Sequence, residues 1–105
     1  MIKISILYPN NGKFDLDYYL NTHMPQSIGL LSAGQGYRGV SVERGLGGAT
    51  SGSAPAYVAL CHYLFDSIED FMAVFLTHAA VLQGDMPNYT DIEPVIQFSE
   101  VAINC

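Results

Sequence analysis

Residues 14–25 read Phe-Asp-Leu-Asp-Tyr-Tyr-Leu-Asn-Thr-His-Met-Pro and predict a short amphipathic helix that carries a histidine inward. Four side chains stand at positions i, i+3, i+4 and i+7 of one helical face: Leu16, Tyr19, Leu20 and His23. Asp15 has the residue type of an N-cap. Because the ring of Pro25 disfavours helical backbone at Met24, we expect the helix to end there. His23 then lies in the final turn, where backbone carbonyls lack partners.

Four segments have the apolar patterns and flanking turn residues typical of β-strands. They cover residues 2–8, 37–44, 57–65 and 95–103. The third segment is apolar on both faces, which indicates a central strand with cover above and below. Residues 45–55 between the second and third strands are rich in glycine and predict a flexible hairpin loop. They lack the lysine and the following helix of a phosphate-binding loop.

A second helix is predicted after the third strand. Asp66 and Glu69 have the spacing of a capping box, and an apolar stripe follows over residues 68–79. We expect this helix to fray over residues 80–84 and to lead into a polar loop. The order βαββαβ predicts one α+β domain over residues 1–105. Its ferredoxin-like form is a four-stranded antiparallel sheet with both helices on one face.

The chain resembles the EthD family, named for a protein associated with ether degradation. The resemblance rests on a Tyr-x-x-x-His-x-Pro pattern formed by Tyr19, His23 and Pro25, and on Pro-Asn-Tyr-Thr-Asp at residues 87–91. It follows the strands and helices over nearly the whole chain. EthD-like proteins are similar to the dimeric α+β barrels, in which two sheets pack face to face. The resemblance therefore implies a homodimer and an accessory role in an oxidoreductase or catabolic pathway.

Composition favours a protein partner and argues against nucleic acid and membrane partners. Only 13% of the residues are charged and half are hydrophobic, so we expect apolar surface that self-association would cover. A net charge of -6 with four Lys and Arg residues leaves no patch for phosphates or an anionic bilayer. No signal peptide pattern opens the chain, so we expect a cytoplasmic protein. Cys61 and Cys105 do not predict a disulfide framework.

His23 is the candidate for proton transfer. Histidine titrates near physiological pH, which suits a general acid or base. The alternative is a capping or core histidine that bonds to nearby carbonyls. Asp85 and Asp91 flank Tyr89 in the region before the last strand, where they either orient His23 or form an ordinary turn. The candidate site has His23 and Asp85 as catalytic residues and, as ligand contacts, Tyr19, Met24 and Tyr89.

The two other histidines are predicted to be structural. His62 has the position of a core histidine on the central strand, and His78 lies at the solvated edge of the second helix. No spacing of histidines, cysteines or carboxylates is typical of a metal site, and the residues imply no cofactor.

The predicted function is binding of a small, largely apolar or aromatic metabolite in a pocket of each subunit, with cofactor-independent acid-base chemistry. Seven tyrosines supply hydrogen-bonding aromatic surface for such a ligand. Two alternatives stay open. One is a haem-handling monooxygenase of the same barrel architecture, with His78 as the iron ligand. The other is a non-catalytic ligand-binding or assembly module.

Overall fold

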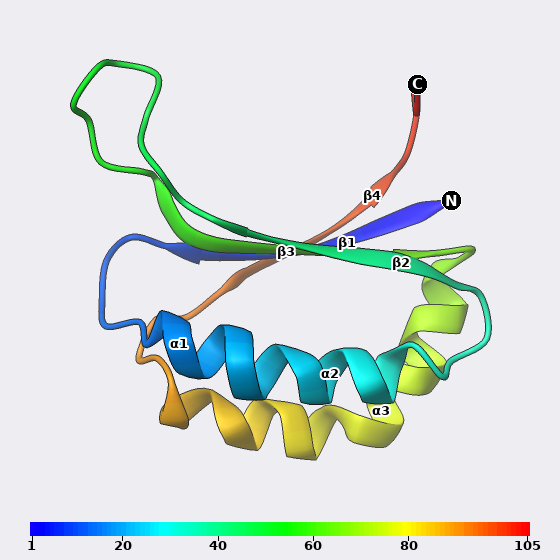
Figure 1. Ribbon diagram of the computed structural model, residues 1–105. Coiled ribbons are helices and arrows are strands. Elements are labelled where there is room, and N and C mark those ends of the chain that lie inside the picture. Colours follow the sequence, from blue (N-terminus) through cyan, green and yellow to red (C-terminus); the bar gives the residue numbers. More distant parts are fainter.

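The computed structural model describes residues 1–105 and contains one four-stranded sheet with helices on a single face (Figure 1). The strands are β1 (Ile2–Pro9), β2 (Tyr37–Arg44), β3 (Tyr57–Phe65) and β4 (Val95–Glu100). The helical elements are α1 (Leu16–Tyr18), the π-helical η1 (Tyr19–His23), α2 (Met24–Leu31), α3 (Ile68–Asp85) and the 3₁₀ turn η2 (Met86–Asn88). The strand order is β2-β3-β1-β4 and every pairing is antiparallel. The predicted ferredoxin-like α+β fold is therefore confirmed.

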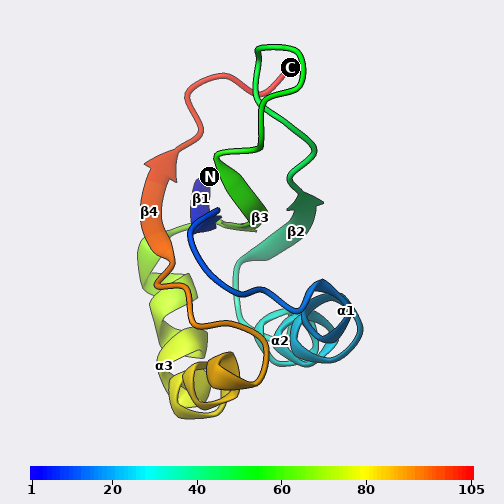
Figure 2. The same cartoon turned by 90° about the vertical axis from the view of Figure 1, so that its left-hand side faces the viewer.

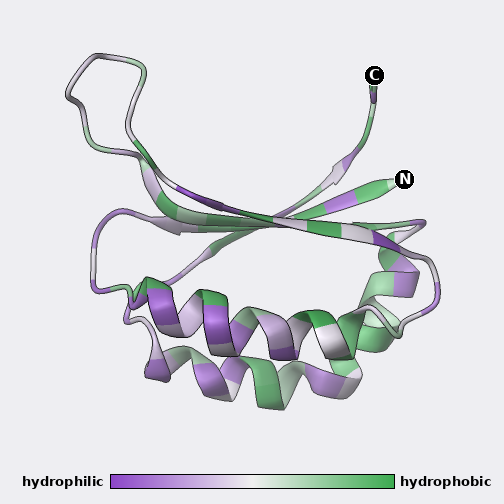
Figure 3. Cartoon of the chain, in the orientation of Figure 1, coloured by the Kyte–Doolittle hydropathy of each residue, from purple (hydrophilic) through white to green (hydrophobic).

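The strand register sorts the side chains onto two faces of the sheet. Ile4 pairs with Tyr63 on one side and with Phe98 on the other, and these residues point toward the helices. The buried core on this face includes Ile4, Tyr8, Ala59, Cys61, Tyr63 and Phe65. The intervening residues point to the opposite face, which no helix covers in either view (Figures 1 and 2). Figure 3 shows that the central strands are nonetheless rich in apolar residues.

The helix around the histidine does not end before Pro25, and the prediction that it would is wrong. Met24 has helical backbone angles, and its N–H donates to the carbonyl of Tyr19, five residues back, in a π-turn. This turn leads directly into α2, where Pro25 stands in the first turn and needs no N–H partner. In a π-turn, the rotation about the helix axis from one residue to the next is smaller than the ~100° of an α-helix. Leu20 is consequently turned outward and is 41% exposed.

Helix α3 is longer than predicted, and its cap lies one residue later. Ser67 is the N-cap, and its hydroxyl accepts from the backbone N–H of Asp70 at 3.1 Å. Asp66 instead accepts two hydrogen bonds from the guanidinium of Arg38. The helix continues without fraying to Asp85, and buried Leu82 holds its last turns on the core. Asp85 therefore lies at the end of a regular helix and not in a loop.

Candidate active site

The imidazole of His23 lies in the interior between the helices and the sheet. The π-turn of η1 places His23 and Tyr19 on the buried side, and His23 is 7% exposed. The ring of Tyr19 stacks against the imidazole, with centroids 5.8 Å apart and an angle of 14° between the planes. The ring of Tyr89 lies on another side, with its centroid 4.5 Å away. These aromatic neighbours fix the orientation of the imidazole.

A carboxylate from α3 holds one nitrogen of this ring. The Nδ1 atom of His23 lies 2.9 Å from Oδ2 of Asp85. The other carboxylate oxygen accepts from the hydroxyl of Tyr18 at 2.6 Å and from the amide of Asn88 at 2.9 Å. The hydrogen bond from Tyr18, with smaller contributions from Asn88 and His23, lowers the pKa of Asp85 although partial burial opposes the shift. Asp85 is thus an ionised acceptor, and we assign the proton of the neutral imidazole to Nδ1.

Two tyrosine hydroxyls face the other nitrogen. The hydroxyl of Tyr89 lies 3.4 Å from Nε2 of His23, and the hydroxyl of Tyr8 lies 2.8 Å from that of Tyr89. Burial raises the pKa of Tyr89 and that of Tyr8, so both phenols stay protonated at neutral pH. A chain of hydrogen bonds therefore runs from Tyr8 through Tyr89 and His23 to Asp85. With the proton on Nδ1, the lone pair of Nε2 accepts only the long contact from Tyr89.

The chain of hydrogen bonds borders a cavity of about 350 Å³ between α2, α3 and the strands β1 and β4. One end of the cavity is polar and is formed by Tyr8, His23, Ser27 and Tyr89. The walls are mainly apolar and consist of Ile6, Phe75, Leu82, Met86, Pro94 and Ile96. The exposed residues Gln83 and Glu93 complete the lining. The volume is at the small end of the range for ligand pockets, which suits a compact apolar molecule with one polar group.

The structure brings together His23, Asp85 and Tyr89 among the predicted site residues, but it does not bring Tyr19 or Met24 to the cavity. Tyr19 is 1% exposed and packs behind the imidazole, because the π-turn centres it on the buried face of the helix. Met24 is also buried in the core, away from the cavity lining. These two side chains pack around the site, and neither lines the cavity.

The sequence analysis missed Tyr8 and Tyr18 as members of the site. The alternation of β1 does point Tyr8 to the same face as Ile4 and Ile6, which was the available signal. Its partner Tyr89 is 81 residues away along the chain, so only the folded structure joins the two hydroxyls. The apolar helical pattern did not indicate Tyr18. This residue lies next to the fully buried Tyr19 and is itself only half-buried.

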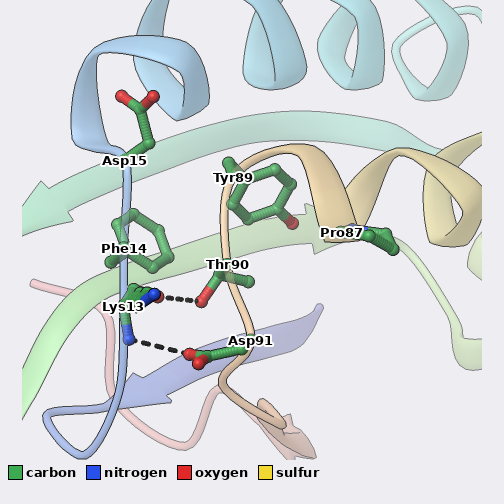
Figure 4. Close-up of a pocket in the computed structure, with 7 residues that line it drawn as sticks. All are labelled: Lys13, Phe14, Asp15, Pro87, Tyr89, Thr90 and Asp91. Carbon is green, nitrogen blue, oxygen red and sulfur yellow. Dashed lines mark hydrogen bonds between the residues drawn. The ribbon is translucent and has the colours of Figure 1, made fainter.

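A second hollow of about 500 Å³ lies between the segment after β1 and the segment after η2 (Figure 4). Two contacts tie its walls together. The N–H of Lys13 donates to Asp91 at 2.7 Å, and the hydroxyl of Thr90 donates to the carbonyl of Lys13 at 2.6 Å. Asp91 therefore joins its own segment to the segment of Lys13. The carboxylate that holds His23 is a different one, that of Asp85. Tyr89 lines this hollow and the cavity on its other side.

The remaining histidines lie outside the cavity. His62 is on the open face of the sheet, where its Nδ1 lies 2.8 Å from the hydroxyl of Ser5 and its Nε2 lies 3.3 Å from Glu43. His78 is half-buried on α3 and does not line the cavity. No group of three or more histidine, cysteine or carboxylate side chains is arranged to hold a metal ion. None of the helices has the length and apolar character needed to cross a membrane.

Comparison with known families gives a direct match. The model of the EthD domain matches residues 13–93, a range that includes His23, Asp85 and Tyr89. The chain belongs to the EthD family. This assignment confirms the resemblance seen in the Tyr-x-x-x-His-x-Pro pattern. No curated protein matches the chain.

Solved structures of EthD proteins share the fold. An EthD-like protein from Ralstonia eutropha JMP134 is 42% identical, over 99% of this chain and 94% of that chain, with a TM-score of 0.89. An ethyl tert-butyl ether D (EthD) family protein from Bacillus halodurans C-125 is 17% identical, over 95% of this chain and 97% of that chain, with a TM-score of 0.65. A candidate monooxygenase from Shewanella loihica PV-4 is 12% identical, over 99% of both chains, with a TM-score of 0.59. The last two likenesses concern the fold alone.

Proposed function

We propose that this EthD protein transfers a proton to and from a small, largely apolar metabolite bound in the cavity, and that His23 carries the proton. One observation supports this proposal above the others. Asp85 holds Nδ1 of His23 at 2.9 Å, while Nε2 has only a weak partner at 3.4 Å and lies at the polar end of an apolar cavity. A ring nitrogen whose lone pair has only this weak partner, next to an apolar cavity, has the geometry of a general base.

The residues at the polar end provide the base and the hydrogen-bond donor that an enolisation needs. Nε2 of His23 removes a proton from a carbon next to a ligand carbonyl, the C–H electron pair forms a carbon–carbon double bond, and the carbonyl π pair moves to oxygen to give an enolate. The hydroxyl of Tyr89 or Tyr8 donates to the enolate oxygen, and Asp85 stabilises the imidazolium. Return of the proton to the same carbon or to a conjugated carbon completes an exchange or an isomerisation. Neither product is oxidised or reduced, so the step needs no oxidant and no cofactor.

Family membership supports the metabolic setting of this chemistry. Small apolar carbonyl compounds and phenols are formed when apolar precursors are oxidised. We therefore propose that the protein acts next to an oxidoreductase in a catabolic pathway and processes a product of that enzyme.

We propose further that a second copy of the chain covers the open face of the sheet. Leu7, Leu60 and Leu64 point to this face and are half-buried, and Val95 on β4 is 46% exposed. Apolar side chains on a helix-free sheet face are costly to leave in water and prone to aggregation. A face-to-face homodimer buries them and leaves one cavity in each subunit.

The test combines a ligand search with three proteins. Uncharged cyclic ketones and phenols are screened for thermal stabilisation, and uptake of solvent deuterium by each hit is followed by NMR. We expect His23→Gln to abolish deuterium uptake, because glutamine is of similar size and forms hydrogen bonds but does not exchange a proton near neutral pH. His62→Gln on the opposite face is the matched control and should retain uptake.

Four results bear on the proposal. Loss of uptake in His23→Gln, with an unchanged circular dichroism spectrum and ligand affinity, supports it. Undiminished uptake in that variant contradicts it. Loss of uptake in His62→Gln alone would move the chemistry to the opposite face of the sheet. Ligand binding with no uptake in the unchanged protein would favour a non-catalytic binding module.

A further inference from the structure

We propose that Glu93 makes the cavity selective for uncharged ligands, so that carboxylates, phosphates and sulfonates are excluded. The inference rests on the proposed function, because it specifies the ligand class of the same cavity. It concerns binding alone and is tested without any turnover.

The cavity offers no positive charge to an anion. No lysine or arginine lines it, and the whole chain has four such residues. Lys13 lines the other hollow, and Arg38 is paired with Asp66. The one side chain in the lining that can become cationic is His23, and the carboxylate of Asp85 already lies 2.9 Å from it. An anion that entered the cavity would lose its hydration without gaining a counter-charge, which is strongly unfavourable.

Glu93 adds a repulsive charge at the solvent side of the cavity. It is an exposed residue, and it is held in place by its neighbours along the chain. Ile92 is 4% exposed, and its N–H donates to the hydroxyl of Thr90 at 3.0 Å. Thr90 in turn donates to the carbonyl of Lys13. These bonds fix the chain next to Glu93, whose side chain is part of the cavity lining, so an incoming anion meets a like charge there.

The polar side chains of the cavity lining favour a ligand with one oxygen atom. The hydroxyls of Tyr8 and Tyr89 form a pair 2.8 Å apart beside Nε2 of His23, and apolar side chains surround the remaining space. A carbonyl or phenol oxygen can accept a hydrogen bond there. The ligand class that fits is an uncharged molecule of one or two rings, with one such oxygen and no acidic group.

Two fluorescent probes isolate the effect of charge. 2-Naphthol is uncharged at neutral pH, and 2-naphthalenesulfonate has the same two rings with a sulfonate in place of the hydroxyl. We expect the unchanged protein to bind the uncharged probe at least ~10-fold more tightly, measured by fluorescence titration. Glu93→Lys should strengthen binding of the anionic probe by roughly 10-fold and change binding of the uncharged probe by less than about 2-fold. Glu93→Gln should give a smaller change in the same direction.

Two control variants separate the cavity from the rest of the surface. Glu100→Lys makes the same change of charge at the end of β4, outside the cavity lining, and should leave both affinities unchanged. Ile96→Trp places a larger side chain in the cavity wall and should abolish binding of the uncharged probe. Survival of that binding in Ile96→Trp would overturn the inference, because the probe would then lie elsewhere.

Equal affinity of the two probes for the unchanged protein would also overturn the inference, as would equal effects of Glu93→Lys and Glu100→Lys. These results are independent of the proton chemistry. His23→Gln should keep the preference for the uncharged probe. The selection by charge can therefore be tested even if His23 does not transfer a proton. Conversely, loss of charge selection does not affect the deuterium exchange assigned to His23.

Discussion

Replacement of Asp85 by asparagine changes both the stability of the protein and the tautomer of His23. The carboxylate accepts from Tyr18 at 2.6 Å, from Asn88 at 2.9 Å and from Nδ1 of His23 at 2.9 Å. Tyr18 and Asn88 both donate to the same carboxylate oxygen. We expect the carbonyl oxygen of the asparagine to replace that oxygen and to accept both bonds. The amide NH₂ of the asparagine then faces Nδ1 and donates to it. The imidazole proton therefore moves to Nε2 and occupies the lone pair that would act as the base.

The magnitude follows from the change in acceptor charge. A hydrogen bond to a charged group contributes about 1.5–3 kcal/mol and a neutral one about 0.5–1.5 kcal/mol. The bonds with Tyr18, Asn88 and Nδ1 of His23 are all retained as neutral bonds, so each loses about 1 kcal/mol. We expect Asp85→Asn to lower the free energy of unfolding by about 3 kcal/mol and Tm by ~15 °C. Deuterium uptake should fall by at least ~100-fold, since general base catalysis is lost.

Denaturant unfolding and the NMR exchange assay measure the two effects. Tyr18→Phe is the matched control, because it removes one donor and leaves the carboxylate on His23. It should lose stability but retain most of the exchange. If Asp85→Asn is as stable as the unchanged protein and still exchanges deuterium, Asp85 does not hold the imidazole.

The pH dependence of stability gives an independent check on Asp85. Its pKa is lowered in the folded protein, so the unfolded chain binds more protons as the pH falls below the ordinary carboxyl range. The stabilisation by Asp85 is therefore complete above that range and is lost as the pH falls through the lowered pKa. The difference in unfolding free energy between the unchanged protein and Asp85→Asn should shrink between about pH 5 and pH 2. A difference that is constant over this range would contradict the assignment.

Three further predictions concern the fold. Burial raises the pKa of Cys61 to about 12, so a thiol reagent should label Cys105 rapidly and Cys61 only after unfolding; rapid labelling of both in the native protein would contradict this. Gly36→Ala should lower the free energy of unfolding in denaturant, because Gly36 has φ of 80° and an added Cβ would meet a carboxylate of α3. Gly29 has open space around it, so Gly29→Ala should not lower the free energy of unfolding. Leu60→Lys should convert a dimer to monomers in sedimentation, and a monomeric unchanged protein at micromolar concentration would refute the second copy on the open face.

The sheet was predictable because its pattern is local and consistent. The bounds of β2 and β3 agree with the apolar pattern, and the dual apolar faces of β3 correctly indicated its central position. The course of the helix through Pro25 was not predictable from local rules. Those rules disfavour helical backbone before proline, but burial of Tyr19 and Leu31 on one face stabilises a continuous helix with a π-turn.

The site was predictable in part. Helical spacing correctly turned His23 inward, and the polar segment before the last strand did contain its partner Asp85. The length of α3 was underestimated because Gly84 is a poor helix former, whereas buried Leu82 and the three hydrogen bonds to Asp85 hold the final turn. The pairing of Tyr8 with Tyr89 joins distant segments, and no local pattern in the sequence indicates it.

The tautomer of His23 tests the central claim most directly. At about pH 9, where an ordinary imidazole is neutral, the ¹⁵N shifts of the His23 ring identify the nitrogen that carries the proton. We expect a proton on Nδ1, a bare Nε2, and a shift of Nε2 when an uncharged phenol binds in the cavity. A proton on Nε2 would make His23 a donor toward the cavity, and the proposed base chemistry would then be wrong.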